Sequence, residues 1–310
     1  MRIIVTEFMD EAAVELMAAH HDTLYQPDLV DRRQALKGLI GDADALIVRN
    51  RTQVNAELLA AAPRLKVVGR LGVGLDNIDV ATCESRGLMV IPATGANALA
   101  VAEYVIGTAI LLLRGAYGST AQVAAGAWPR TALSNGREIG GKTLGIVGFG
   151  GIGRLTARLG RALGMRAIGF DALLPPADRA WSDAQVEPRT LDALLAQADV
   201  LTLHVPLVPA TRNLLDAARV GAMKPGAILI NTARGGVVDE QAVAAALRSG
   251  RLGGAALDVF EKEPLPAGSP LAGCPNLLLT PHVAGVTAES NERVSTMIAE
   301  RVIAALASCH

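Results

Sequence analysis

Aromatic residues are scarce in this sequence: Phe, Trp and Tyr make up 3% of its 310 residues, whereas hydrophobic residues as a whole make up 51%. The core must therefore be built from alanine and aliphatic side chains, which is typical of helices that cover buried parallel strands. We expect an α/β fold. Because domains average about 150 residues, the length favours two domains over one.

Cysteine is also scarce, and its pattern argues against two kinds of site. Cys83, Cys274 and Cys309 are odd in number and lack any metal-ligand spacing. Neither a disulfide framework nor a cysteine-bound metal is indicated, so we expect reduced thiols, a cytoplasmic protein and no metal ion.

No charge of one sign dominates, and long hydrophobic runs are absent. The 29 basic and 30 acidic residues give a net charge of −1, which leaves no electrostatic footprint for nucleic acid or an anionic membrane. The longest apolar run, Tyr104 to Leu113, has ten residues, whereas a bilayer crossing needs about 20. Glu7 and Asp10 interrupt the N-terminus where a signal peptide would be apolar. We therefore expect a small-molecule partner and neither a nucleic-acid nor a membrane partner.

What the sequence does contain is an alternation of short apolar runs with segments of helical period. The first hundred residues predict a small βα domain with strands in "RIIVTE", "ALIVRN", "KVVGRL" and "LMVIP". Residues 97–117 predict a long buried helix, and a second series then predicts strands in "TLGIVGF", "RAIGFD", "DVLTLHVP", "AILINTAR", "GGAALDVF" and "NLLLTPH". This rhythm predicts doubly wound parallel sheets in two Rossmann-like domains. A final helix over 288–308 is expected to return to the first domain and make that domain discontinuous.

Three glycines stand where the first strand of the second series meets a helix. Gly148, Gly150 and Gly153 fit G-x-G-x-x-G, in which the glycines allow a tight turn, close approach of a pyrophosphate and close packing of helix on strand. The helix N-terminus would receive the phosphate charge. Asp171 ends the next strand near the ~20-residue offset of a ribose-binding acid, and its charge favours NAD over NADP.

The histidines differ in what their positions indicate. His20, His21 and His310 lie in a helix end and a tail, which indicates solvated surface. His204 follows a strand. A hydrogen bond from its side chain that orders the loop explains this position at least as well as a catalytic role does. His282 follows another strand in "LLLTPHVAG", where the preceding proline and the small residues suit a side chain that projects into a cleft.

Two further charged residues lie near the ends of strands. Arg234, in "ILINTARGG", has glycines beside it that leave room for a ligand, although pairing with a surface acid is the alternative. Glu263, in "DVFEKEPLP", lies among other acids and on local grounds alone is equally consistent with a solvent-facing side chain.

The motifs "GFGGIGR", "HVPLVPATRNLL", "NTARGGVVDE", "ALDVFEKEPLP" and "NLLLTPHVAG" resemble, in order and spacing, those of the D-2-hydroxyacid dehydrogenase family. "KVVGRLGVGLDNID" resembles that family's substrate-domain loop, and the resemblance covers essentially the whole chain. It implies a substrate domain over 1–97 and 283–310, an NAD-binding domain over 98–282, and a homodimer formed largely by the cofactor domain.

The resemblance also implies roles for individual residues. Arg234, Glu263 and His282 become the catalytic set. The cofactor contacts that it implies, with those of the glycine motif, are Gly148, Gly150, Gly151, Ile152, Gly153, Asp171, His204, Pro206, Thr211, Thr232, Ala233 and Asp258.

These residue types suit hydride transfer between C2 of a 2-hydroxy acid and nicotinamide. His282 suits both proton removal and proton donation, because free histidine titrates near pH ~6.5. Glu263 would fix the imidazole tautomer, and the planar guanidinium of Arg234 would hold the substrate carboxylate. The backbone amides around Val73 and Gly74 are expected to hold the same carboxylate.

The stretch "VRNRTQV" contains the residues that we expect to bind the far end of the substrate. This stretch and "EFMDEAAVE" resemble the (S)-sulfolactate dehydrogenase branch of the family, whereas "KVVGRLGVGLDNID" resembles the phosphoglycerate dehydrogenases. We expect Arg51, with Arg49 or Arg70, to bind a second anionic group on C3. A solvated loop charge at Arg51 is the alternative.

Other functions remain open from the sequence alone. 3-Phosphoglycerate dehydrogenase and hydroxypyruvate or glyoxylate reductase are alternatives within the family. An NAD-responsive scaffold, as in the C-terminal-binding-protein corepressors, shares the fold but usually has extended disordered tails, which this chain lacks. The third class is a hydrolase or isomerase that uses a bound dinucleotide internally. A turnover assay that follows NADH absorbance distinguishes such an enzyme from a dehydrogenase.

Overall fold

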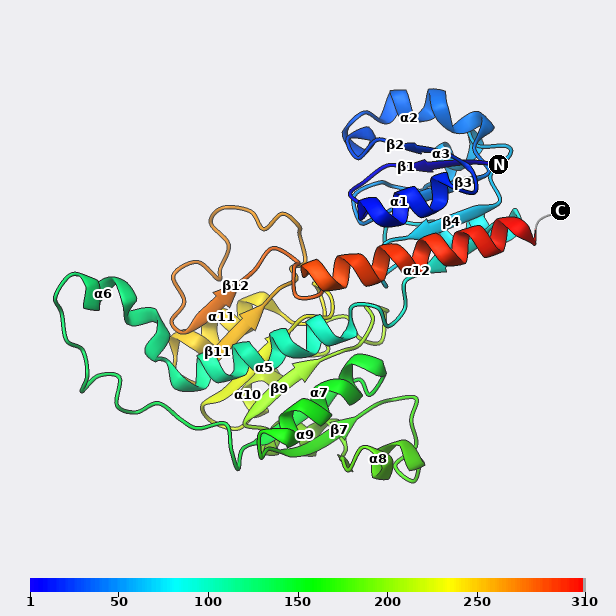
Figure 1. The fold of residues 1–310 in the computed structure, drawn as a ribbon. Helices are drawn as coiled ribbons and strands as arrows, with labels where there is room; N and C mark the ends of the chain where they lie inside the picture. Colours follow the sequence, from blue (N-terminus) through cyan, green and yellow to red (C-terminus); the bar gives the residue numbers. More distant parts are fainter. Residues whose placement is uncertain (309–310) are drawn as a thin grey trace. The chain divides into compact units, whose positions relative to one another are not determined.

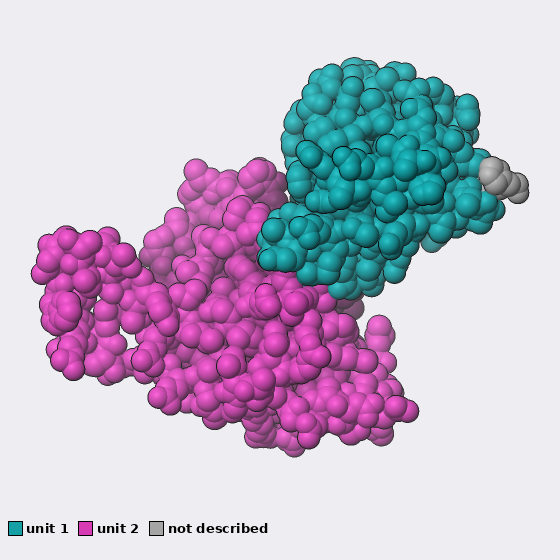
Figure 2. All heavy atoms as spheres, viewed as in Figure 1, with its two compact units in different colours: residues 1–97, 286–310 teal, residues 98–285 magenta. Residues whose placement is uncertain are grey.

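A computed structural model describes residues 1–308, and Cys309 and His310 lie outside the described residues (Figure 1). The chain forms two compact units (Figure 2). Unit one comprises residues 1–97 and the chain from Val286 onward, and unit two comprises Ala98–Gly285. The first unit is thus built from two chain segments, which confirms the predicted discontinuity.

The sheet of unit one has five parallel strands in the order β2-β1-β3-β4-β5. Its central strand β3 reads ALIV and is buried at every position, as expected for a strand with helices on both faces. The edge strand β2 has no fully buried residue and no continuous apolar run, and the sequence did not predict it. The strands are β1 (Arg2–Val5), β2 (Asp22–Tyr25), β3 (Ala45–Val48), β4 (Val67–Arg70) and β5 (Met89–Pro92).

Helices cover both faces of this sheet. Because side chains alternate along a strand, Ile3 and Val5 join a hydrophobic cluster with helices α1 and α12, whereas Ile4 joins a second cluster with α2, α3 and α4. The α-helices are α1 (Glu11–Ala18), α2 (Arg33–Leu39), α3 (Ala56–Ala60), α4 (Val80–Ser85) and α12 (Ala288–Ala307), with short 3₁₀ turns η1 (Leu29–Asp31) and η2 (Ile40–Asp42).

The C-terminal helix α12 packs closely on strand β4. The hydroxyl of Thr287 caps its N-terminus by accepting a hydrogen bond from Ser290 N at 3.0 Å. A Cβ atom added at Gly69 of β4 would lie 3.0 Å from both Ile298 and Val302. The glycine therefore lets the helix approach the sheet.

The sheet of unit two has seven parallel strands in the order β12-β11-β10-β9-β6-β7-β8. Strand β6 lies between β7 and β9. The chain continues from β6 to β7 and β8 on one side and then crosses to β9 on the other, which makes the carboxyl end of β6 a topological switch point. The strands are β6 (Thr143–Val147), β7 (Arg166–Phe170), β8 (Glu187–Pro188), β9 (Val200–Leu203), β10 (Ala227–Asn231), β11 (Leu252–Leu257) and β12 (Leu277–Leu279). All but the two-residue β8 were predicted, and the doubly wound α/β class is confirmed.

Helices also cover both faces of the second sheet (Figure 1). One hydrophobic cluster contains residues of α5 and α7, and the other contains residues of α9, α10 and α11. The helices are α5 (Ala98–Arg114), α6 (Thr120–Ala124), α7 (Gly151–Ala162), α8 (Arg179–Asp183), α9 (Leu191–Gln197), α10 (Ala217–Ala222) and α11 (Glu240–Arg248), with the 3₁₀ turn η3 (Ala116–Ser119).

The long helix α5 ends three residues earlier than predicted. Gly115 has φ +66°, a left-handed conformation that stops the helix after Arg114. The following segment, with η3 and α6, projects from the body of unit two (Figure 1). Tyr117 and Trp128 on this segment are 57% and 78% exposed.

In the described part of the chain, no single helix has the length and apolar character to cross a membrane. Over residues 1–308, only α5 and the neighbouring segment Ala116–Ala124 reach that length and composition together, and they are bent by 68°.

Candidate active site

The glycine-rich turn after β6 is shaped by two contacts that exclude side chains. A Cβ atom on Gly148, which has φ +92°, would lie 2.5 Å from the carbonyl oxygen of His204. A Cβ atom on Gly153 would lie 2.3 Å from the carbonyl oxygen of Gly148. At Gly150 and Gly151, by contrast, a Cβ atom would meet nothing within 4 Å. The backbone at these two positions therefore faces open space in which a ligand can approach it.

The N-terminus of α7 begins at this turn. Its N-cap residue is Gly150, and no side chain caps the helix. The first backbone N–H groups, from Gly151 to Gly153, have no partner within the helix and carry its positive dipole end. This arrangement fits the pyrophosphate of a dinucleotide such as NAD.

Asp171 follows β7 and lies beside the same turn. Its Oδ2 accepts a hydrogen bond from Phe149 N at 2.7 Å, and its Oδ1 accepts one from Leu173 N at 2.8 Å. Each carboxylate oxygen has a second acceptor site, so the half-buried side chain retains capacity for a hydroxyl donor.

The loop after β10 contains an unpartnered buried hydroxyl. Among residues 1–308, Thr232 Oγ1 is buried without a hydrogen-bond partner. Asn231 fixes the neighbouring backbone: its Oδ1 accepts from Ala233 N and its Nδ2 donates to the carbonyl oxygen of Arg234, both at 3.0 Å. A buried hydroxyl without a protein partner keeps its hydrogen-bonding capacity for a ligand that enters this loop.

His204 is held inside the loop after β9. One ring nitrogen, Nε2, lies 3.1 Å from the hydroxyl of Thr202, and desolvation lowers the pKa of His204 to about 4. The imidazole is therefore neutral near pH 7. Farther along this loop, the hydroxyl of Thr211 donates to the carbonyl oxygen of Pro206 at 2.5 Å and accepts from Val208 N at 2.9 Å, which orders the turn.

His282 and Glu263 form a hydrogen-bonded pair. The distance from His282 Nδ1 to Glu263 Oε2 is 2.8 Å, and the side chains are 38% and 37% exposed. The other oxygen of Glu263 accepts a hydrogen bond from Phe260 N at 3.0 Å. A carboxylate at Nδ1 favours the tautomer with hydrogen on that nitrogen, which leaves Nε2 as the base.

A buried carboxylate, Asp258, holds the loop that carries His282. It is 1% exposed, and it accepts hydrogen bonds from Val283 N, Ala284 N and the hydroxyl of Thr280 at 2.9, 2.8 and 2.6 Å. His282 itself has φ +58°, and its N–H donates to the carbonyl oxygen of Asp258 at 2.8 Å. These bonds stabilise a backbone conformation that non-glycine residues rarely adopt.

Tyr104 extends this network. Its hydroxyl lies 2.6 Å from the hydroxyl of Thr280, and burial raises the pKa of Tyr104. Tyr104 and Thr280 were not predicted from the sequence. The sequence marks them only weakly: Tyr104 is a hydroxyl-bearing residue within an apolar helix, and Thr280 comes just before the Pro-His pair.

Arg234 lies in the loop after β10, beside the loop that carries Glu263. Its Nη1 donates to the carbonyl oxygen of Ala233 at 2.6 Å. A Cβ atom on the next residue, Gly235, would lie 1.8 Å from the carbonyl oxygen of Phe260, so the two loops meet backbone to backbone. Because β10, β11 and β12 are neighbours in the sheet, their carboxyl ends bring Arg234, Glu263 and His282 to one edge.

In unit one, the predicted arginines lie in the turn after β3. Arg49 Nη2 donates to Asn291 Oδ1 at 2.8 Å, and its guanidinium carbon lies 5.7 Å from the centroid of the Phe8 ring. Burial lowers the pKa of Arg49, and the charge of Glu7 opposes this. Arg51 is exposed and forms an ion pair with Asp31, and that hydrogen bond raises the pKa of Arg51.

The remaining predicted residues of unit one follow β4. Arg70 ends the strand, and its Nη1 donates to the carbonyl oxygen of Leu71 at 3.0 Å. Val73, which is 37% exposed, and Gly74 lie in the loop that follows.

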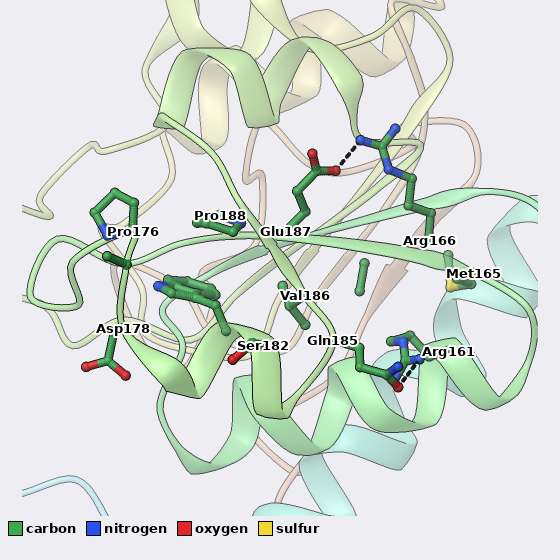
Figure 3. A pocket seen from close by; sticks show the side chains of 13 residues that line it. Arg161, Met165, Arg166, Pro176, Asp178, Ser182, Gln185, Val186, Glu187 and Pro188 are labelled. Atoms are coloured by element: carbon green, nitrogen blue, oxygen red, sulfur yellow. Dashed lines mark hydrogen bonds and ion pairs between the residues drawn. The ribbon is translucent and has the colours of Figure 1, made fainter.

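A hollow of about 580 Å³ in unit two lies away from these strand ends, between α8, β8 and the end of α7 (Figure 3). Its charged residues pair with one another or with amides: Arg166 with Glu187 and Arg161 with Gln185. None of the predicted site residues lines it.

In the same described residues, no group of three or more His, Cys, Asp or Glu side chains is placed to hold a metal ion.

Comparison with known proteins gives consistent matches. The family model for "D-isomer specific 2-hydroxyacid dehydrogenase, NAD binding domain" matches residues 106–284. The (S)-sulfolactate dehydrogenase of Chromohalobacter salexigens is 52% identical over 304 residues, which covers 98% of each chain. The D-3-phosphoglycerate dehydrogenase of Mycobacterium leprae is 43% identical over 275 residues, which covers 89% of this chain but 51% of that protein. Among solved structures, a glyoxylate reductase from Paecilomyes thermophila has a TM-score of 0.84 with 30% identity, covering 97% of this chain and 94% of that one.

Proposed function

Because the chain belongs to the D-isomer specific 2-hydroxyacid dehydrogenase family, we propose that its substrate is a D-type 2-hydroxy acid with a second anionic group, such as (S)-3-sulfolactate. The chain is an NAD-dependent 2-hydroxyacid dehydrogenase. The observation that carries the chemistry is the His282–Glu263 hydrogen bond at the sheet edge that also holds Arg234.

The proton chemistry is assigned to His282. NAD, when bound, supplies the acceptor for the hydride that leaves C2 of the substrate. His282 takes the hydroxyl proton at Nε2 during oxidation and returns it during reduction. Glu263 orients the ring through Nδ1 and stabilises the imidazolium that forms.

Substrate orientation is assigned to Arg234. Its guanidinium presents a planar set of N–H donors that matches a carboxylate and polarises the neighbouring carbonyl oxygen. The close packing at Gly235 supports this role, because it fixes the Arg234 loop against the loop of Glu263.

The cofactor is assigned to the turn after β6 and the strand ends beside it. Gly148, Gly150 and Gly153 shape the turn, and the N–H groups of Gly151 and Ile152 would bind the pyrophosphate. Asp171 would accept hydrogen bonds from the adenosine ribose, and its charge would disfavour the 2′-phosphate of NADP. The other residues assigned to the cofactor are Thr232, with its unpartnered hydroxyl, Ala233, His204, Pro206, Thr211 and Asp258.

The second substrate anion is assigned to Arg49 and Arg51, and unit one is accordingly assigned as the substrate domain. Within residues 1–308, the Arg49 guanidinium makes one hydrogen bond, to Asn291, which leaves most of its N–H donors available. Arg51 can exchange its exposed pairing with Asp31 for a substrate anion, because exposed ion pairs contribute little free energy. Val73 and Gly74 are assigned to the substrate carboxylate through their backbone N–H groups.

Kinetics of Arg51→Ala and Arg49→Ala test this assignment. Loss of a charge-assisted hydrogen bond should lower kcat/KM for 3-sulfolactate about 10- to 150-fold in either variant, while turnover of lactate stays nearly constant. Arg33→Ala serves as the matched control, since Arg33 is also a surface arginine of unit one in an ion pair, with Glu57. A wild type that prefers lactate, or variants that lose both activities equally, would contradict the second-anion proposal.

3-Phosphoglycerate is the second candidate substrate. The 43% identity to a phosphoglycerate dehydrogenase favours it, and the same arginines suit a phosphate. A substrate panel with sulfolactate, phosphoglycerate, glycerate and glyoxylate separates these alternatives by kcat/KM.

We also propose a cytoplasmic homodimer. The projecting segment with α6 supports the dimer, because it exposes Tyr117, Val123 and Trp128, which are apolar residues that a partner subunit would cover. The free thiols of Cys83 and Cys274 are typical of a reducing compartment.

A further inference from the structure

Glu7 follows β1 and is buried beneath the turn that carries Arg49 and Arg51. Its side chain is only slightly exposed, at 4%. One carboxylate oxygen accepts hydrogen bonds from Arg49 N and Thr52 N, both at 2.9 Å, and the other accepts one from Arg51 N at 3.1 Å. Charge-assisted hydrogen bonds of this kind are stronger than those to a neutral acceptor. A single buried side chain thus binds three of the four N–H groups of residues 49–52.

The other side of the same turn is held by Asn77 and Thr6. The side chain of Asn77 donates to the carbonyl oxygens of Thr52 at 2.7 Å and Arg49 at 3.3 Å. The hydroxyls of Thr6 and Thr52 lie 2.9 Å apart. The backbone from 49 to 52 is therefore fixed from both β1 and the loop after β4, whereas Asn50 and Arg51 are exposed to solvent.

The side chain of Arg49 is fixed as well. Asn291 at the start of α12 accepts its hydrogen bond, and the Phe8 ring lies beneath the guanidinium. Phe8 is 52% exposed, which places an aromatic ring at the surface beside the Arg49 cation.

We propose that Glu7 is a positioning residue that fixes the 49–52 turn and thereby determines the preference for a substrate with a second anion. This inference rests on the proposed function, since it assumes that Arg49 and Arg51 bind that anion. Glu7 does not touch the substrate in this proposal. It acts through the backbone of the turn, so its loss should weaken binding of the dianion without slowing the hydride transfer.

The test uses Glu7→Gln in the full-length protein with NAD. The amide keeps one acceptor oxygen but presents an NH₂ group toward a backbone N–H, so at least one hydrogen bond to the turn is lost. We expect the KM for 3-sulfolactate to rise about 10-fold while its kcat and the KM for lactate stay unchanged. Hydrogen–deuterium exchange should become faster in a peptide covering residues 48–54 and remain unchanged in the rest of unit one.

Asp44→Asn is the matched control. Asp44 is also a buried carboxylate of unit one, 3% exposed, and accepts a backbone hydrogen bond from Arg2 N at 2.9 Å, but it holds no residue of the 49–52 turn. It should lower the melting temperature without changing the ratio of the two KM values. Asn77→Ala loosens the same turn from its other side and should also raise the KM for 3-sulfolactate. It replaces Glu7→Gln in this test if that variant does not fold.

Three outcomes would overturn the proposal: an unchanged sulfolactate KM, an equal rise in both KM values, or the same KM ratio change in Asp44→Asn. Failure of the proposed function is seen separately, because it shows in the wild type as no preference for a dianion. In that case hydrogen–deuterium exchange still tests whether Glu7 fixes the turn, and unchanged exchange over residues 48–54 in Glu7→Gln overturns the positioning role.

Discussion

At the residue scale, two histidines that follow strands of unit two have opposite surroundings. His282 is 38% exposed and has a carboxylate 2.8 Å from Nδ1. Within residues 1–308, His204 has only the hydroxyl of Thr202 as a side-chain partner, and desolvation lowers its pKa to about 4. A base whose pKa is about 4 accepts a proton poorly near pH 7, so these surroundings favour His282 for proton transfer and His204 for ordering its loop.

Replacement of His282 with alanine should lower kcat about 10²- to 10⁴-fold, which is the usual contribution of a positioned acid or base. The dissociation constant of NADH should change little, because the glycine turn is untouched. Steady-state kinetics and NADH fluorescence titration measure the two effects. Near-normal turnover would remove His282 from the catalytic set.

His204 should make the folded state more sensitive to acid. Its pKa is lower in the folded protein, about 4, than the ordinary value of 6.5 in the unfolded chain, so the unfolded chain binds the proton first as pH falls. This residue's contribution to stability is therefore complete above pH ~6.5 and is lost between about 6.5 and 4, by as much as about 3 kcal/mol.

Urea unfolding of wild type and His204→Gln at pH 7, 5.5 and 4.5 checks this effect. The wild type should lose more unfolding free energy than the variant over this range. Parallel curves for the two proteins would mean that another group causes the acid sensitivity.

At the element scale, glycines determine how closely helices and loops approach the sheet of unit two. Gly153 lets α7 begin against the turn after β6, where a Cβ atom would also lie 3.2 Å from Ile146. Gly235 likewise lets the loop after β10 contact the backbone of the loop after β11. Backbone atoms cannot move aside as flexible side chains can, so these positions resist any substitution.

Gly153→Ala should destabilise the protein by about 1–3 kcal/mol and weaken NADH binding at least about 10-fold, because α7 must shift from the turn. Gly221→Ala in α10 is the matched control, since a Cβ atom there meets nothing within 4 Å. The control should be neutral or stabilise by up to about 1 kcal/mol. Equal NADH affinity in both variants would contradict the assignment of this turn to the cofactor.

At the scale of the whole molecule, the chain builds two parallel-sheet units and places its candidate functional residues at carboxyl ends of strands in each. Arg49 and Arg51 follow β3 in unit one, and Arg234 and His282 follow β10 and β12 in unit two. Connections at these ends carry the variable residues in α/β folds, while the sheets provide a rigid support. Unit two also carries the projecting segment with α6, which contributes nothing to either hydrophobic cluster of that unit.

Trp128→Ser should weaken self-association without affecting the fold. Trp128 is 78% exposed, and an aromatic residue covered by a partner subunit typically contributes about 2 kcal/mol or more, which corresponds to at least a ~30-fold rise in the dimer dissociation constant. Sedimentation velocity across a concentration series measures it, with Leu173→Ser, at an apolar residue 92% exposed elsewhere in unit two, as the control. A wild type that is monomeric, or a variant that associates as tightly, contradicts the homodimer.

The sequence by itself determined the α/β class, ten of the twelve strands within the described residues 1–308, and the glycine turn, because these depend on local periodicity and on backbone freedom at fixed spacing. It missed β2 and β8, which lie at sheet edges and lack the apolar run of a buried strand. The candidate residues Arg234, Glu263 and His282 were likewise recognisable from their motifs.

Only the tertiary structure decided what those residues contact. Glu263 lies 19 positions from His282 in the chain, and Glu7 lies more than 40 positions from the turn that it binds. In the sequence Glu7 was notable only for interrupting an apolar N-terminus, and Asp258 only as part of a motif. Their buried carboxylates gained hydrogen-bond partners because parallel strands bring distant chain segments to the same sheet edge, and no local pattern encodes that proximity.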